Sequence, residues 1–357
     1  MADDLTESGD VWQAQDTSPG EVAAALRELL KQRHAETEAF VPARVLNLVV
    51  IVDRDWRGEI QNRLDKVGSY HASRTILVSV EPGRKTIDAS AAMTAEDEVK
   101  RGELAVAHEH VVLDIGEKHL KGLDTIVDPL VVSDLATLVW SPHRHHEGVD
   151  AMAKLAQVIL IDSENTEGPE YAVKRSSELA ERHYVVDLSW LRSTPWRERV
   201  ASTFDPGQWR GDLTSVSSVT VRHKPDSAMA GYLLLGWLSS RLGWEPGPMT
   251  EHAGGAQGKA KAHKHEIKLS LEPDDTMTAP GLAGITVESA RGMSISLDRG
   301  PGGLTAHRLT PDGQDQTWTV TGASRGESGI LGQGIRQALL RDHTYSPALA
   351  AAEKMLG

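Results

Sequence analysis

The chain has 357 residues, of which 39% are hydrophobic and 25% charged, and its formal net charge at pH 7 is −13. This length exceeds what a single core usually supports, so two domains are expected, and the acidic balance argues against nucleic acid or an anionic membrane as a partner. The sequence contains no cysteine, which excludes disulfides, thiolate nucleophiles and cysteine-ligated metals within the chain.

The first residues show no targeting pattern. Residues 1–20 are acidic and polar and lack the apolar run of a secretory signal. The longest apolar stretches, at 45–52 and 231–238, are too short to span a bilayer. We therefore expect a cytoplasmic protein.

Residues 1–40 are expected to form an N-terminal tail and a helix. Residues 1–18 have the composition of a disordered tail. A helix is predicted from Ser18, because Ser18 is a good cap, Pro19 suits the first helical position and Glu21 completes a capping box.

Residues 41–166 predict an α/β domain with a parallel or mixed sheet covered by helices. The nearly continuous apolar runs at 44–53 and 73–80 predict strands buried on both faces, and the helical spacing between them predicts a parallel crossover. Segments 86–93 and 104–114 alternate more and suit a less buried edge. Further elements are expected in the order helix 117–130, strand 135–140, helix 147–156 and strand 158–162.

Residues 167–357 predict an α+β domain with an antiparallel sheet. Helices are expected at 169–182, from about 190 to 203, and at 226–244, with a strand at 215–223. The Gly-, Ala- and Lys-rich segment 247–262 is interpreted as a mobile loop. Turn residues then separate five short strand candidates and two closing helices, at 264–272, 283–289, 293–298, 304–310, 317–322, 327–342 and 346–356.

Two groups of histidines suggest a metal site. His108 and His110 flank Glu109 in a predicted strand, where both imidazoles share a face. A second group, His143, His145 and His146, follows the strand that ends at Trp140, where α/β sheets often bind ligands. If the groups meet, they suit a metal-dependent hydrolase; otherwise they are surface residues.

The sequence lacks the usual nucleotide- and nucleophile-bearing motifs. It has no G-x-x-x-x-G-K-[ST] loop, no G-x-G-x-x-G between the first strand and its helix, and no G-x-S-x-G elbow. We therefore expect no cofactor and no enzymatic activity.

Tryptophan beside arginine is the most distinctive feature of the sequence. Trp190, Arg192, Trp196 and Arg197 lie within eight positions of one another. Trp and Arg are common interface anchors, and Arg stacks on indole. The alternative is that these residues belong to a core.

Five segments, taken in order, are similar to those of the glucose-6-phosphate dehydrogenase assembly proteins, the OpcA family. The most specific is DLSWLRSTPWRERVASTFD at 187–205, and the others are RVLNLVV at 44–50, RTILVSV at 74–80, VVSDLATLVWSP at 131–142 and VILIDSEN at 158–165. The likeness runs from roughly residue 40 to residue 357. The chain departs from the family at Ala136, where a Pro is frequent, and at Trp140-Ser141, where two Trp residues are frequent.

The resemblance implies a non-catalytic partner that binds glucose-6-phosphate dehydrogenase and supports its assembly or activity in the oxidative pentose phosphate pathway. As partner-interface residues we predict Trp140, Trp190, Arg192, Trp196 and Arg197. The alternatives are the metal-dependent hydrolase above and a sensor that binds a sugar phosphate at the carboxyl edge of the sheet. The oligomeric state stays open.

Overall fold

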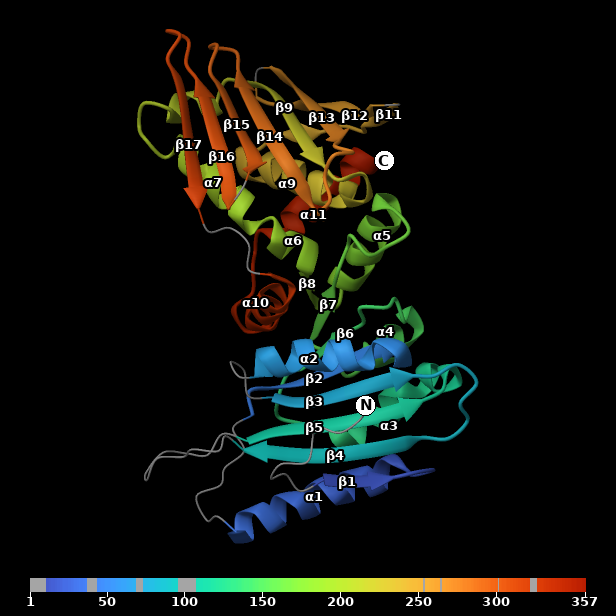
Figure 1. The fold of residues 1–357 in the computed structure, drawn as a ribbon. Coiled ribbons are helices and arrows are strands. Elements are labelled where there is room, and N and C mark those ends of the chain that lie inside the picture. The colour runs from blue at the N-terminus through green and yellow to red at the C-terminus, as the bar shows by residue number, and fades with distance from the viewer. Residues whose placement is uncertain are drawn as a thin grey trace. The chain divides into compact units, whose positions relative to one another are not determined.

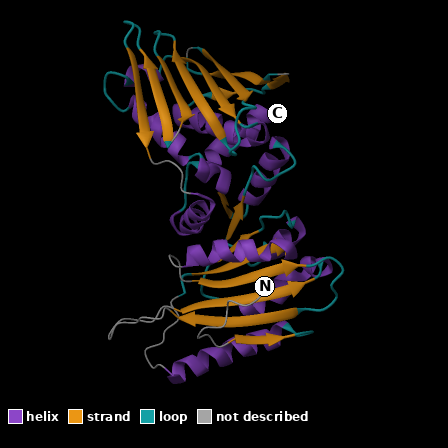
Figure 2. Cartoon of the chain, in the orientation of Figure 1, coloured by secondary structure: helices purple, strands orange, loops and turns teal. Residues whose placement is uncertain are grey.

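The computed structural model describes residues 11–36, 44–68, 73–95, 107–252, 254–263, 265–300, 302–321 and 326–357. The chain forms two compact units, each built on a sheet with helices (Figures 1 and 2). Unit 1 comprises residues 1–161, 183–186 and 331–339, and unit 2 comprises residues 162–182, 187–330 and 340–357. The domain limits drawn from the sequence stay a prediction.

Unit 1 contains an eight-stranded sheet with the order β1-β4-β5-β3-β2-β6-β7-β8. The strands are β1 (Val11–Ala14), β2 (Leu46–Asp53), β3 (Ser73–Val80), β4 (Asp88–Ala95), β5 (Ala107–Ile115), β6 (Thr137–Trp140), β7 (Val158–Ile161) and β8 (Tyr184–Asp187). From β5 to β7 each strand runs parallel to its neighbour, whereas β4 pairs antiparallel with both β1 and β5. The sheet is therefore mixed, within the range expected from the sequence.

The central strands of this sheet are buried on both faces. Every residue from Leu46 to Val52 is buried, which explains the unbroken apolar run in the sequence. The helices of this unit, including short 3₁₀ segments (η), are α1 (Pro19–Glu36), η1 (Arg54–Trp56), α2 (Arg57–Gly68), η2 (Glu117–Gly122), α3 (Leu123–Val127), η3 (Asp128–Leu130) and α4 (His146–Met152). The helix predicted over 117–130 is thus mostly 3₁₀.

Two expectations for unit 1 were wrong. Part of the tail expected to be disordered forms β1, because the backbone of Val11–Ala14 pairs with β4. Residues 1–10 lie outside the described residues. The segment expected at an edge of the sheet, β5, lies inside it between β4 and β3.

Unit 2 contains a nine-stranded sheet with the order β10-β12-β13-β9-β14-β15-β16-β17, and β11 pairs with β12. The strands are β9 (Val216–His223), β10 (Glu245–Pro246), β11 (Thr250–His252), β12 (Gly255–Lys261), β13 (Glu266–Pro273), β14 (Leu282–Ser289), β15 (Ser294–Gly300), β16 (Gly303–Leu309) and β17 (Asp315–Thr321). The sheet is mixed rather than purely antiparallel, because β13 runs parallel to β9. The chain between these two strands includes a long helix, the kind of crossover that parallel neighbours require.

The segment 247–262, interpreted from its composition as a mobile loop, consists largely of β11 and β12. One of its glycines, Gly255, lies where the backbone of β12 closely approaches the backbone of β13. Gly255 has φ +122°, and a Cβ there would lie 1.9 Å from the carbonyl oxygen of Leu271. Glycine is therefore needed to place β12 against β13.

The helices of unit 2 are α5 (Pro169–Ala180), α6 (Leu188–Arg192), α7 (Thr194–Phe204), α8 (Arg210–Leu213), η4 (Pro225–Ser227), α9 (Ala228–Leu242) and α11 (Tyr345–Leu356). Helix α10 (Gly326–Leu340) contributes residues to both units. Ten of the fifteen residues of α9 are buried, as its apolar sequence predicts. No helix in the described ranges has both the length and the apolar character that crossing a membrane requires.

Candidate functional site

Trp190 in α6 is the centre of a buried aromatic–charge cluster in unit 2. Its side chain is 2% exposed, and its indole N–H donates a hydrogen bond of 2.8 Å to Asp342. The guanidinium of Arg197 lies 3.5 Å from the ring centroid, and the Tyr345 ring meets the indole edge-on at 5.6 Å. The bond to Asp342 gives the buried indole N–H the hydrogen-bond partner that a tryptophan in a protein core usually has.

Arg197 is itself buried against this indole. Its guanidinium donates to the carbonyl of Trp190 at 2.6 Å and to the hydroxyl of Ser193. Burial lowers the pKa of Arg197 to about 10, although the nearby carboxylate of Asp342 opposes that change. Its stacking and both hydrogen bonds fix α6 against α7.

Arg192 faces a group of carboxylates at the start of unit 2. It binds Asp162 in a bidentate pair at 2.8 and 2.7 Å, and one nitrogen lies 3.6 Å from Glu164. Asp187 caps α6 by accepting from the N–H of Ser189, and it also accepts from the N–H of Ser163. One guanidinium thus offsets part of the negative charge of this group.

Burial perturbs two of these carboxyls. Desolvation, reinforced by Asp162, raises the pKa of Glu164 to about 7 and that of Asp187 to about 6. Perturbed carboxyls are frequent at functional sites, but ion-pair networks inside proteins produce them as well. Each carboxyl oxygen of Asp187 has a donor, because the Tyr345 hydroxyl completes the set at 3.2 Å. We interpret the group as an internal network that positions α6.

The residues predicted as partner contacts are therefore mostly internal. Trp190, Trp196 and Arg197 are buried in unit 2, and Trp140 is buried in β6 of unit 1. Arg192 is largely buried in its pair with Asp162. The four buried side chains pack internally and Arg192 is partly exposed, so the interface role of these five residues stays a prediction.

The strand order of unit 1 identifies a second candidate region. Without the antiparallel strands β1 and β4, the order is β5-β3-β2-β6-β7-β8. In order of appearance along the chain this is 3-2-1-4-5-6, the order of dinucleotide-binding folds. Such sheets bind ligands at the carboxyl ends of their strands, where the order reverses. In this chain that point lies between β2 and β6.

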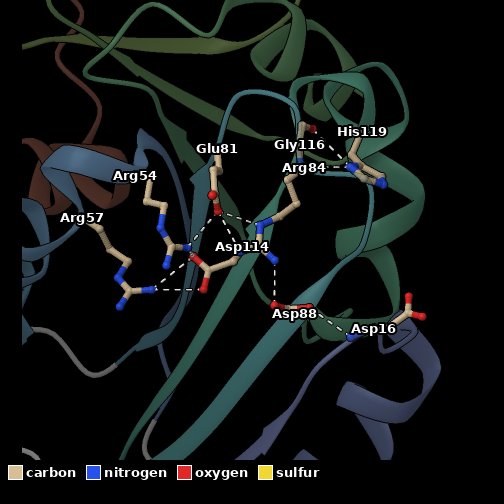
Figure 3. Close-up of polar contacts among 9 residues, drawn as sticks. All are labelled: Asp16, Arg54, Arg57, Glu81, Arg84, Asp88, Asp114, Gly116 and His119. Carbon is tan, nitrogen blue, oxygen red and sulfur yellow. Dashed lines mark hydrogen bonds and ion pairs between the residues drawn. The ribbon is translucent and has the colours of Figure 1, made fainter. Parts of the chain in front are cut away.

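The turn after the first strand of this fold normally carries glycines that let phosphates approach the backbone. Here it is η1, with the sequence Arg54-Asp55-Trp56. Arg54 lies 3.0 Å from Asp114 and 3.3 Å from Glu81, and Arg57 contacts both oxygens of Asp114 at 3.1 Å (Figure 3). Ion-paired side chains therefore lie beside the turn in place of the glycines that would let a phosphate approach the backbone.

The same network continues along the edge to β4. Arg84 donates to Glu81 at 2.8 Å and to Asp88 at 2.7 Å, and the Asp16 N–H also binds Asp88 (Figure 3). The hydrogen bond from Asp16, followed by the pair with Arg84, lowers the pKa of Asp88. A Cβ on Gly116 would lie 1.9 Å from the Arg84 carbonyl, so glycine is needed where these loops meet.

The second histidine group lies at the same edge, beside β2. The Asp53 N–H donates to Nδ1 of His143 at 3.0 Å, and Nε2 of His145 lies 2.9 Å from the Asp53 carboxylate. The Trp56 and His143 rings are 5.8 Å apart. Burial lowers the pKa of His143 although Asp53 opposes this, so its ring favours the neutral form.

The two histidine groups do not meet. His108 and His110 do share a face near the start of β5, with ring centroids 6.5 Å apart, as predicted. His143, His145 and His146 follow the carboxyl end of β6, and β5, β3, β2 and β6 are all parallel, so the groups occupy opposite edges. The shared metal site of the hydrolase hypothesis is therefore not formed, and the described residues include no cluster of at least three His, Asp or Glu suited to a metal.

Two family models match the chain in sequence order. Residues 64–178 match the glucose-6-phosphate dehydrogenase subunit N-terminal domain, and residues 183–349 match the corresponding C-terminal domain. The chain belongs to the OpcA family. The resemblance drawn from the five sequence segments is thereby confirmed.

Curated OpcA relatives are distant and longer. The chain is 26% identical over 258 residues to the OxPP cycle protein OpcA of Synechococcus elongatus, covering 70% of this chain and 54% of that protein. An OpcA of Nostoc punctiforme is 28% identical over 142 residues, 39% of this chain and 30% of the relative. The aligned region thus spans about half, or less, of the curated relatives.

Among solved structures, the WlbA (WbpB) dehydrogenase of Thermus thermophilus, in complex with NAD and α-ketoglutarate, is similar in outline. It is 13% identical, with a TM-score of 0.43 over 87% of this chain and 94% of that one.

Proposed function

We propose that this chain is a non-catalytic accessory protein that binds glucose-6-phosphate dehydrogenase and promotes its assembly or its active state. The observation that carries the proposal is the pair of family models, described as the N- and C-terminal domains of a glucose-6-phosphate dehydrogenase subunit. The OxPP cycle name of the relatives supports the pathway. The binding itself, the activation and a cytoplasmic location belong to this proposal.

The carboxyl edge of unit 1 supports an accessory role over a dehydrogenase role. A dinucleotide needs a glycine-rich turn after the first strand and a free carboxylate after the second, which binds a ribose hydroxyl. Here η1 carries Arg54 and Trp56 at the first position. At the second position Glu81 is already paired with Arg54 and Arg84.

An accessory protein of this kind works by differential binding. It shifts the dehydrogenase toward an active conformation or oligomer only if it binds that state more tightly. A tenfold shift needs about 1.4 kcal/mol of difference between the two binding free energies. A few well-placed surface contacts suffice for such a difference.

The test is to mix the purified chain with glucose-6-phosphate dehydrogenase from the same organism and to measure the mass of the mixture by size-exclusion chromatography with light scattering. We expect a species heavier than either protein alone. The chain with the acidic protein bovine serum albumin is the control for non-specific association. Separate elution at micromolar concentrations, with and without substrate, would remove the proposal.

A further inference from the structure

The carboxyl edge of unit 1 carries an exposed tryptophan. All nine tryptophans of the chain lie among the described residues, and Trp56 is the most exposed of them, at 51%. It lies at the end of η1, directly after the first strand of the dinucleotide-type order. The place where related topologies hold a cofactor therefore carries a protruding indole.

The ion-pair network at this edge is balanced in charge. The guanidinium groups of Arg54, Arg57 and Arg84 face the carboxylates of Glu81, Asp88 and Asp114 (Figure 3). Three positive and three negative groups give this network no net charge. Such a surface does not attract a phosphate as an uncompensated arginine cluster would.

The arrangement matches the composition of a protein interface. Binding hot spots are rich in Trp and Arg, and they consist of a few anchors within a polar rim that excludes water. Trp56 supplies the apolar anchor, with one aromatic neighbour, His143. Ion-paired side chains form the rim, including the pair of Arg63 with Glu59 one turn along α2. Paired rim charges are already oriented, so a partner orders few additional side chains.

We propose that the carboxyl edge of unit 1, centred on Trp56, is the surface that docks glucose-6-phosphate dehydrogenase. The proposal rests on the proposed function and adds the docking face. The dehydrogenase is the occupant because both family models describe a subunit of that enzyme, and because the turn and the paired Glu81 leave the edge without the groups that hold a dinucleotide.

The test compares the dissociation constant of the full-length chain for the dehydrogenase among four proteins. These are the wild type, Trp56→Ala, Trp56→Phe and the control Tyr171→Ala, which removes another exposed aromatic, on α5. We expect Trp56→Ala to raise the dissociation constant about tenfold or more. Trp56→Phe should have a dissociation constant between those of Trp56→Ala and the wild type, and Tyr171→Ala should bind like the wild type. Circular dichroism confirms that each variant is folded.

The outcomes separate the docking face from the function. If the wild type binds and Trp56→Ala binds equally well, the docking face is wrong and the accessory function stands. If the wild type does not bind, both fail. In a parallel calorimetric titration, NADP⁺ should give no saturable binding to the chain alone, and neither should glucose 6-phosphate. Binding of either ligand that Trp56→Ala abolishes would make this edge a small-molecule site and overturn the proposal.

Discussion

The chain contains two tryptophan–arginine clusters that are similar in composition and opposite in environment. In unit 2 the Trp190 indole is buried, stacked on Arg197 and hydrogen-bonded to Asp342. In unit 1 Trp56 is exposed, and the neighbouring arginines are paired with carboxylates at the surface. The first cluster has every feature of internal packing, whereas the second has the features of a contact surface.

The difference shows that residue type does not separate a core from an interface. Both demand large apolar area with a polar handle, so both favour Trp and Arg. In this pair of tryptophans the difference is burial: Trp190 is 2% exposed, whereas Trp56 is 51% exposed. Trp190 finds Asp342, more than a hundred residues away in sequence, and no local pattern reveals this pairing.

The largest effect is expected from Trp190→Ala. Removing this indole leaves a large cavity and deprives the buried Arg197 of its stacking partner. Substitutions of this kind cost about 3–5 kcal/mol of the free energy of unfolding. Urea denaturation followed by circular dichroism measures the loss. A change below about 1 kcal/mol would show that the cluster is not part of the core.

A smaller effect is expected from Arg192→Ala, which removes the cation that pairs with Asp162 and lies 3.6 Å from Glu164. Breaking a largely buried pair costs about 3 kcal/mol. The matched variant in unit 1 is Arg57→Ala, whose pair with Asp114 is more exposed and is worth at most about 1 kcal/mol. Equal losses in thermal or chemical unfolding of the two variants would contradict the contrast between the clusters.

Next in size is the pH dependence that comes from Glu164. Burial raises its pKa to about 7, so the folded state holds a proton that the unfolded state has already released near pH 5. Stability therefore falls as pH rises from about 4.5 to 7, and Asp187, whose pKa is raised to about 6, acts in the same direction.

Glu164→Gln should remove most of this slope and stabilise the protein at pH 8 by about 2 kcal/mol. The measurement is the free energy of unfolding at pH 5, 6, 7 and 8 for both proteins. Parallel curves for the variant and the wild type would show that Glu164 ionises normally in the folded chain.

The smallest effect on stability is expected from Trp56→Ala. A half-exposed indole with one ring neighbour contributes little to folding, so the free energy of unfolding should change by less than about 0.5 kcal/mol. Thermal denaturation of Trp56→Ala and Trp190→Ala under the same conditions compares the two losses of stability. A loss similar to that of Trp190→Ala would place Trp56 in the core and weaken its proposed role in docking.

Local features of the fold were predictable from the sequence. The capping box was predicted from Ser18 and Glu21, and the Ser18 N–H does bind the Glu21 carboxylate at 2.8 Å. The continuous apolar runs became β2 and β3, paired in parallel as predicted. These features depend on residues close together in the chain, where spacing and propensity decide the outcome.

Non-local features were not predictable. β1 and β12 are strands because a partner strand supplies their hydrogen bonds, although their own residues favour a tail and a loop. The 3-2-1-4-5-6 order depends on crossover paths that leave no trace in any short segment. One signal of the candidate docking surface was available: Arg54 and Trp56 occupy the turn where a dinucleotide fold needs glycine, and Arg57 follows directly.

The most direct test of the account is a titration of dehydrogenase activity with this chain. The quantity measured is kcat/KM for glucose 6-phosphate at fixed NADP⁺, with the chain alone assayed under the same conditions. We predict a saturable rise in kcat/KM with the wild type, a curve shifted to higher concentration with Trp56→Ala, and no turnover by the chain alone. An activity that never responds to the chain, or NADPH formed without the dehydrogenase, would contradict the account.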